Sequence, residues 1–119
     1  MPNEQRSRVH IEFTPEVKRN LRTLAKKYRH IRSDIEPVLD RLETGEVLGD
    51  QIQGSGLTTF KVRVQNSDIR KGKRAGYRLI YYLKSPTQII LLTIYSKLEQ
   101  ADISAEKIRR ILKEFESLR

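Results

Sequence analysis

The N-terminal part of the chain changes from a strand pattern to a helix pattern. Apolar and polar residues alternate over residues 9–13, which predicts a short, half-buried strand. Thr14 and Pro15 are the residue types of a helix start, with the threonine as N-cap and the proline at the first helical position. Spacings of three and four residues then predict a helix to about Tyr28 with one apolar stripe: Val17, Leu21, Leu24 and Tyr28.

A second helix is predicted from about Ser33, because Ser33 and Glu36 have the spacing of a capping box. Pro37 would then fall in or just after the first turn, where a helix tolerates proline. Gly45 is a suitable C-terminal stop. The two helices should form an antiparallel pair, and the apolar stripe of the second is Ile35, Val38, Leu39 and Leu42.

From Leu57 onward the pattern has a period of two, which predicts strands. Over residues 59–64 apolar side chains point to one face, and Lys61 and Arg63 point to the other. Residues 66–76 read as a charged loop, and residues 77–83 as the next strand. The turn at residues 85–87 leads to a strand over residues 89–97 that is apolar on both faces, which favours an interior position.

A closing helix is predicted after Ser104, which would cap it. The resulting order is β-α-α-β-β-β-α, without an internal repeat or a linker. We therefore expect residues 1–119 to form a single α+β domain with a mostly antiparallel, twisted sheet packed on a helical hairpin and a C-terminal helix. The stripe of that last helix is Ile108, Ile111, Leu112, Phe115 and Leu118.

Composition excludes several classes of function. The chain has no cysteine, so disulfides, thiolate metal sites and a cysteine nucleophile are ruled out. His10 and His30 are too few for a typical zinc site and lack ligand spacing, so no metal or cofactor is expected. The apolar runs are too short for a membrane span, and the N-terminus has no apolar signal region. We expect a small, soluble, cytoplasmic protein.

Positive charge is concentrated in two segments. The chain carries 24 Lys and Arg against 15 Asp and Glu, a net charge of +9. Residues 16–32 hold seven basic and one acidic side chain, and residues 60–84 hold eight and one, whereas residues 33–59 between them hold one and six. Such clustering is typical of a protein that binds a polyanion, although a solvated helix face would explain the first cluster equally well.

Two strand motifs resemble those of a known family. Residues 76–82, Gly-Tyr-Arg-Leu-Ile-Tyr-Tyr, resemble a strand of the RelE/ParE toxin superfamily. Residues 95–104, Tyr-Ser-Lys-Leu-Glu-Gln-Ala-Asp-Ile-Ser, resemble a segment of its HigB-like branch. The Lys-Val-Arg at residues 61–63 and the basic residues 70–74 are similar to that branch as well. The resemblance covers about residues 9–115, and residues 57–104 carry the specific motifs.

The resemblance implies a RelE-like fold and the toxin of a type II toxin–antitoxin module. Such a toxin is an mRNA interferase that cleaves mRNA, commonly on the ribosome. Its implied partners are mRNA, the ribosome and a cognate antitoxin, either a helix-turn-helix protein or an acidic helical segment. Two alternatives remain open: a ParE-like inhibitor of DNA gyrase, and a degenerate toxin that binds nucleic acid without cleaving it.

Metal-independent RNA cleavage needs a base for the 2′-hydroxyl proton, a cation for the phosphorane and an acid for the leaving 5′-oxygen. Arg78 matches the arginine of the family's motif, so the resemblance assigns it to the phosphorane; a salt bridge to Glu99 or Asp102 is the alternative. Lys97 is a candidate for phosphate contact or general acid. Glu99 is a candidate base, or else it orients a neighbouring cation.

Tyr95 is the fourth catalytic candidate, and the remaining candidates contact RNA. Tyr95 could stack on an unpaired base or could be the last core residue of its strand. The predicted RNA-binding cations lie on one strand and in the charged loop: Lys61, Arg63, Arg70, Lys71, Lys73 and Arg74. The chain also departs from the ribosome-dependent RelE pattern, because Leu98 and, approximately, Ser104 stand where that pattern has an arginine and a tyrosine. The general acid and base are therefore open.

Overall fold

The computed structural model describes residues 8–69 and 75–118. The elements in chain order are β1 (His10–Phe13), α1 (Pro15–Lys27), α2 (Ile31–Glu43), β2 (Asp50–Gln51), β3 (Thr59–Val64), β4 (Tyr77–Ser85), β5 (Gln88–Ser96) and α3 (Ala105–Ser117). The fold is a small α+β domain with three helices and a mixed five-stranded sheet within the described residues. The predicted order is confirmed, with the two-residue strand β2 as an addition.

The sheet has the strand order β1-β5-β4-β3-β2. The pairs β2–β3, β3–β4 and β4–β5 are antiparallel, and β1 is parallel to β5, with His10 opposite Gln88 and Phe13 opposite Leu91. The prediction of a mostly antiparallel sheet is thus confirmed. β5 lies between two strands and is buried over residues 89–96, which confirms its predicted interior position.

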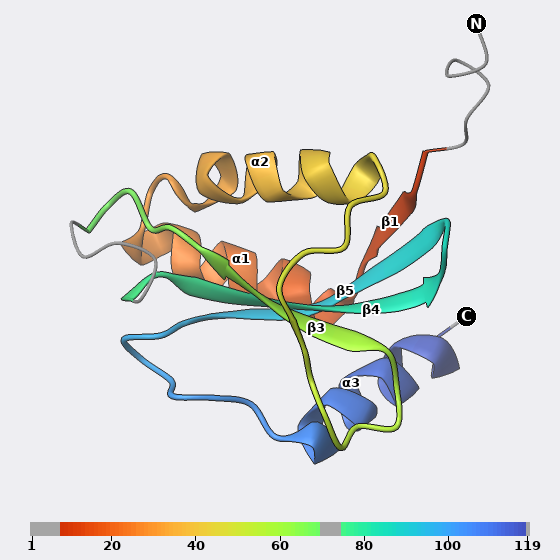
Figure 1. Ribbon diagram of the computed structural model, residues 1–119. Coiled ribbons are helices and arrows are strands. Elements are labelled where there is room, and N and C mark those ends of the chain that lie inside the picture. Colours follow the sequence, from red (N-terminus) through yellow and green to blue (C-terminus); the bar gives the residue numbers. More distant parts are fainter. Residues whose placement is uncertain (1–7, 70–74, 119) are drawn as a thin grey trace, which may run out of the picture.

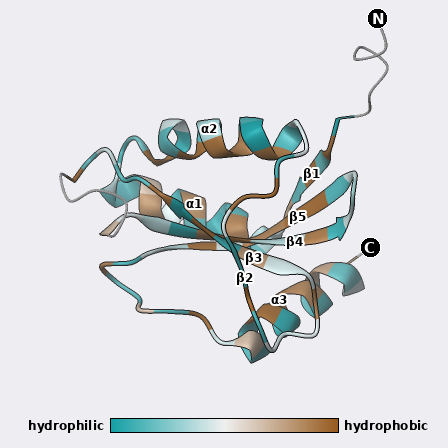
Figure 2. Cartoon of the chain, viewed as in Figure 1, coloured by the Kyte–Doolittle hydropathy of each residue, from teal (hydrophilic) through white to brown (hydrophobic). Residues whose placement is uncertain are grey.

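Helices cover both faces of the sheet (Figure 1). α1 and α2 lie on one face, where an apolar core includes Leu21, Ile31 and Leu79. α3 lies on the opposite face over a second, smaller core that includes Ile80 and Ile108. Figure 2 shows the apolar side of α2 turned toward the sheet, as its sequence stripe predicts.

The start of α1 follows the sequence prediction. The Thr14 hydroxyl accepts a hydrogen bond from the Val17 amide at 3.0 Å, and Pro15 occupies the first helical position. The same hydroxyl donates to the Leu92 carbonyl at 2.8 Å. Thr14 is fully buried, so this one side chain both caps the helix and ties it to β5.

The start of α2 differs from the prediction. The helix begins at Ile31, and His30 is the N-cap residue without a side-chain cap. The Ser33 hydroxyl donates to the His30 carbonyl at 2.9 Å instead of capping the helix, so the predicted capping box with Glu36 is wrong. Pro37 consequently lies inside the helix rather than near its first turn.

The sequence also predicted the C-terminal end of α2 and both ends of α3. Gly45 follows the C-cap of α2 with φ of 101°, a left-handed conformation that favours glycine, in agreement with its predicted role as a stop. The Ser104 hydroxyl accepts from the Lys107 amide at 3.1 Å, which confirms it as the cap of α3. Leu118 was expected in the apolar stripe of α3 but is 71% exposed, because the helix ends at Ser117.

Candidate nucleic-acid interface

Strand register brings together most of the predicted site residues that the structure describes. Arg63 on β3 lies opposite Arg78 on β4, and Arg78 lies opposite Tyr95 on β5. Lys61 is two residues before Arg63 and opposite Ile80, so it points to the same face as this row. These four side chains therefore share the face of the sheet that α3 partly covers. Their chemical roles stay predictions.

Arg78 is the buried arginine of the row, with 5% exposure, whereas Arg63 is exposed. One Arg78 Nη1 hydrogen bond goes to the Tyr77 carbonyl at 3.2 Å. Burial, together with the positive charge of Arg63, lowers the pKa of Arg78 from its ordinary value. The guanidinium stays charged at neutral pH even so, because its ordinary pKa lies so high. The sheet thus holds a partly desolvated cation beside a second, solvated one.

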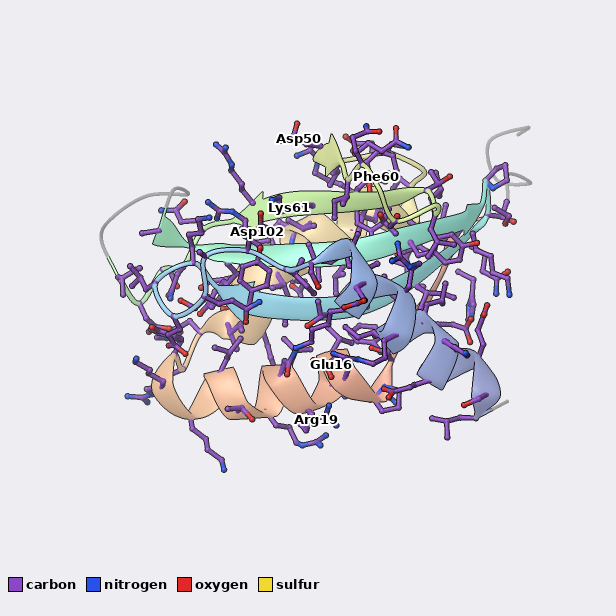
Figure 3. All side chains as sticks on the ribbon, turned by 90° about the horizontal axis from the view of Figure 1, so that it is seen from below. Glu16, Arg19, Asp50, Phe60, Lys61 and Asp102 are labelled. Atoms are coloured by element: carbon purple, nitrogen blue, oxygen red, sulfur yellow. The ribbon has the colours of Figure 1, made fainter. Side chains whose placement is uncertain are left out.

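Two acidic residues adjoin Lys61 at this face: Asp50, opposite Lys61 on β2, and Asp102, which contacts its ammonium. Asp102 makes the more extensive contacts. Its Oδ1 accepts hydrogen bonds from the Lys61 ammonium at 3.1 Å, the Tyr95 hydroxyl at 3.4 Å and the Ile103 amide at 2.8 Å. Figure 3 shows Lys61 and Asp102 side by side. The Ile103 hydrogen bond and then the Lys61 contact hold the pKa of Asp102 below its ordinary value, so the group is a carboxylate at neutral pH.

Asp102 is not among the functional residues predicted from the sequence. The sequence indicated this aspartate only as a salt-bridge partner of Arg78. Its place in the 95–104 motif was the available signal, since that motif also supplies Tyr95. The sequence does not indicate that the Asp102 carboxylate contacts Lys61 on β3.

Tyr95 is 5% exposed, and its hydroxyl contacts Asp102. Burial, reinforced by the neighbouring carboxylate, raises the pKa of Tyr95 to about 12. The hydroxyl therefore keeps its proton at neutral pH and can donate it. The ring also belongs to the apolar core under α3, so of the two roles left open from sequence, the core role is the one the packing displays.

Lys97 and Glu99 follow the end of β5. The Lys97 amide donates to the Gly76 carbonyl at 2.9 Å, and its ammonium donates to the Ala101 carbonyl. Glu99 turns toward α1, where Oε2 accepts from the Lys27 ammonium and the Tyr28 hydroxyl, each at 3.1 Å. The described contacts of Glu99 therefore lie at the end of α1 rather than at the Arg63–Arg78–Tyr95 row.

Gly76 precedes Tyr77 and Arg78 at a position where the backbone leaves no room for a side chain. A Cβ atom at this position would lie 2.1 Å from the Val64 carbonyl oxygen, a distance that no side chain permits. The glycine lets β4 begin directly against the end of β3, where Val64 pairs with Tyr77. This close approach sets the register that places Arg78 opposite Arg63.

The other basic residues fall into two groups. Arg70, Lys71, Lys73 and Arg74 lie outside the described residues. The basic residues of α1 and the following turn are exposed, and two of them pair with carboxylates: Arg19 with Glu16 at 2.7 Å and Lys27 with Glu99 at 3.1 Å. The first charge cluster is thus a solvated surface, located mainly on one helix.

Neither histidine lies at the site. His10 is exposed on the edge strand β1. The ring and the amide of His30 contact the Asp68 carboxylate at 2.7 Å and 2.9 Å. Within residues 8–69 and 75–118, no three His, Asp or Glu side chains gather as a set of metal ligands.

Three surface pockets include residues of the site in their lining, and two of them lie at Lys61 and Tyr95. One of about 400 Å³ lies between β2, β3 and the start of α3, and its lining includes Asp50, Lys61 and Asp102. The other, of about 350 Å³, lies between α1 and the end of β5, and its lining includes Tyr95, Glu99 and Lys107. A ligand on this face could therefore approach Lys61 and Tyr95 from solvent.

The chain matches no protein-family model. Among the helices in the described part of the chain, none combines the length and apolar character that crossing a bilayer requires.

Proposed function

We propose that this protein is a RelE/HigB-like toxin of a type II toxin–antitoxin module, a cytoplasmic endoribonuclease that cleaves mRNA on the ribosome. The observation that carries the proposal is the cross-strand row Arg63–Arg78–Tyr95 with Lys61 beside it. Three cations and a protonated hydroxyl on one sheet face suit a phosphodiester better than a neutral ligand. The cognate antitoxin would cover this face.

In the proposed reaction the 2′-hydroxyl oxygen attacks the adjacent phosphorus, and the bond from phosphorus to the 5′-oxygen breaks. The products are a 2′,3′-cyclic phosphate and a free 5′-hydroxyl, so no co-reactant is needed. Arg78 would stabilise the additional negative charge of the phosphorane, and Lys61 and Arg63 would hold neighbouring phosphates. Tyr95 carries a proton at neutral pH and would give it to the leaving 5′-oxygen.

The base is the less defined role. Glu99 would have to release Lys27 and Tyr28 before it could approach a 2′-hydroxyl at the row. Positioning and charge stabilisation by the cations would therefore supply most of the rate enhancement.

The test is expression of the chain alone in a bacterium, with mRNA ends mapped by sequencing. Growth arrest with breaks inside translated codons is expected, and the Arg78→Met variant should abolish both. Lys84→Met is the matched control, because Lys84 is an exposed lysine on the same strand. An Arg78→Met chain as toxic as the parent would remove the assigned site, and intact mRNA with DNA breaks would indicate gyrase poisoning.

A second candidate function is nucleic-acid binding without cleavage. Two observations favour it: Arg78 is 5% exposed, and Asp102 places a negative charge against Lys61 and Tyr95. This function predicts RNA binding with steep salt dependence and no new RNA ends. Purified protein incubated with RNA and with translating ribosomes separates the two candidates.

A further inference from the structure

The segment of residues 97–104, which joins β5 to α3, is held in place by the predicted site residues themselves. Lys61 and Tyr95 contact Asp102, and the Lys97 ammonium contacts the Ala101 carbonyl. Glu99 fastens the first half of the segment to α1. The side chains assigned to RNA are thus already engaged with a short piece of the same chain.

The Asp102 carboxylate resembles a phosphate oxygen in what it contacts. A single oxygen receives an ammonium, a hydroxyl and a backbone amide, which are the donors that proteins use for phosphate. Its side chain is 65% exposed, whereas that of Lys61 is 30% exposed. The carboxylate therefore sits on the solvent side of the lysine, where an incoming phosphate would have to bind.

From these contacts we propose that Asp102 is an internal competitor for RNA phosphate and limits the affinity of this face for nucleic acid. Bound RNA displaces the carboxylate from Lys61 and loosens the second half of the 97–104 segment, while Glu99 keeps the first half on α1. The pocket lined by Asp50, Lys61 and Asp102 is the entry for that phosphate. This inference rests on the proposed function, since it requires that the face binds RNA.

Exchange of the Asp102 carboxylate for an RNA phosphate at Lys61 is energetically feasible. An exposed ion pair such as Lys61–Asp102 stabilises a fold only weakly, because water screens it and its side chains lose entropy. RNA phosphate brings condensed counterions that are released on binding, so it competes well at low salt. A weak internal contact of this kind lowers affinity without blocking the site.

The experiment measures binding of a short 2′-O-methyl RNA, which lacks the attacking hydroxyl and stays intact. Asp102→Asn keeps the size and the hydrogen-bonding oxygen of the side chain but removes its charge. We expect it to tighten binding about fivefold, the lower end of usual coupling between two sites. Asp50→Asn is the matched control: it removes an exposed carboxylate from the same pocket and should tighten binding less than about twofold.

A double-mutant cycle distinguishes competition from a general loss of negative charge. In a Lys61→Met background, the gain from Asp102→Asn should fall below about twofold, because the competed cation is gone. A gain that stays the same in both backgrounds would overturn the inference. So would equal gains from Asp50→Asn and Asp102→Asn, or weaker binding by the Asp102→Asn chain.

Release of the segment has its own readout. The natural chain has no cysteine, so Ala101→Cys accepts a single spin label at an exposed position of the segment. RNA binding should increase the mobility of this label; unchanged or reduced mobility would contradict displacement. RNA binding by the parent chain without these effects overturns only the role of Asp102, whereas failure of the parent chain to bind RNA overturns the proposed function as well.

Discussion

Arg63 and Arg78 lie directly opposite each other on β3 and β4. Like charges in this position destabilise an antiparallel pair, and Arg78 is buried in addition. The arrangement is unfavourable for a sheet that only needs to fold and favourable for one that binds an anion. The pair therefore fits the anion-binding face that we propose.

The first prediction follows from that pair. Arg78→Met removes the contacts of the guanidinium, including the hydrogen bond to Tyr77, but it also relieves the charge repulsion with Arg63, so we expect the free energy of unfolding to fall by no more than about 1–2 kcal/mol. RNA affinity should fall about tenfold or more, since charged hydrogen bonds of about 1.5–3 kcal/mol are lost. Urea unfolding and fluorescence anisotropy measure the two effects. Retained affinity, with Lys84→Met as the control, would count against an anion site at Arg78.

Local features of the fold could be predicted because short-range patterns determine them. The Thr14 cap, the Gly45 stop and the alternating faces of β3 each depend on a few neighbouring residues. The parallel pairing of β1 with β5 depends on contacts between residues 10–13 and 88–91, and no local pattern encodes it. β2 has only two residues, too few for any period to show.

The sequence predicted the part of the site that lies on regular strands better than the part that lies in the irregular segment after β5. Alternation and the β3–β4–β5 order were sufficient to bring Arg63, Arg78 and Tyr95 into one row. Glu99 and Asp102 lie in an irregular segment, where the direction of a side chain depends on its tertiary partner. Glu99 therefore pairs with Lys27 and Asp102 with Lys61, neither of which the sequence indicates.

Two buried tyrosines, Tyr77 and Tyr81, allow a test of how much a hydrogen-bonded hydroxyl contributes to the free energy of unfolding. The Tyr81 hydroxyl donates to the Leu48 carbonyl at 2.7 Å and accepts from the Leu48 amide at 2.9 Å. The Tyr77 hydroxyl is buried without a hydrogen-bond partner among the described residues. Tyr81→Phe should therefore lower the free energy of unfolding by about 1–3 kcal/mol, and Tyr77→Phe should be neutral or stabilising. Urea unfolding of both variants checks this, and the reverse ranking would contradict it.

Thr14 should be a stability determinant beyond a usual helix cap. Thr14→Val keeps the shape of the side chain but removes both the cap on Val17 and the hydrogen bond to Leu92. We expect a loss of about 1–3 kcal/mol in the free energy of unfolding. Thr14→Ser retains the hydroxyl and should lose less than about 1 kcal/mol. A serine variant less stable than the valine variant would show that packing of the methyl group matters more.

The last prediction concerns pH and Asp102. Its pKa is lowered in the folded protein, chiefly by the Ile103 amide and then by Lys61, so its ionised form stabilises the fold. That stabilisation is present above the ordinary carboxyl pKa and disappears as the pH falls through the lowered value. Because the side chain is 65% exposed, we expect a difference of only about 0.5 kcal/mol between the parent and Asp102→Asn at pH 7.

Urea unfolding should show this difference at neutral pH and none in strong acid, below the folded pKa. Asp50→Asn, which removes a second exposed carboxylate of the same pocket, is the control. A difference for Asp102→Asn that persists in strong acid would mean that shape rather than charge holds the segment.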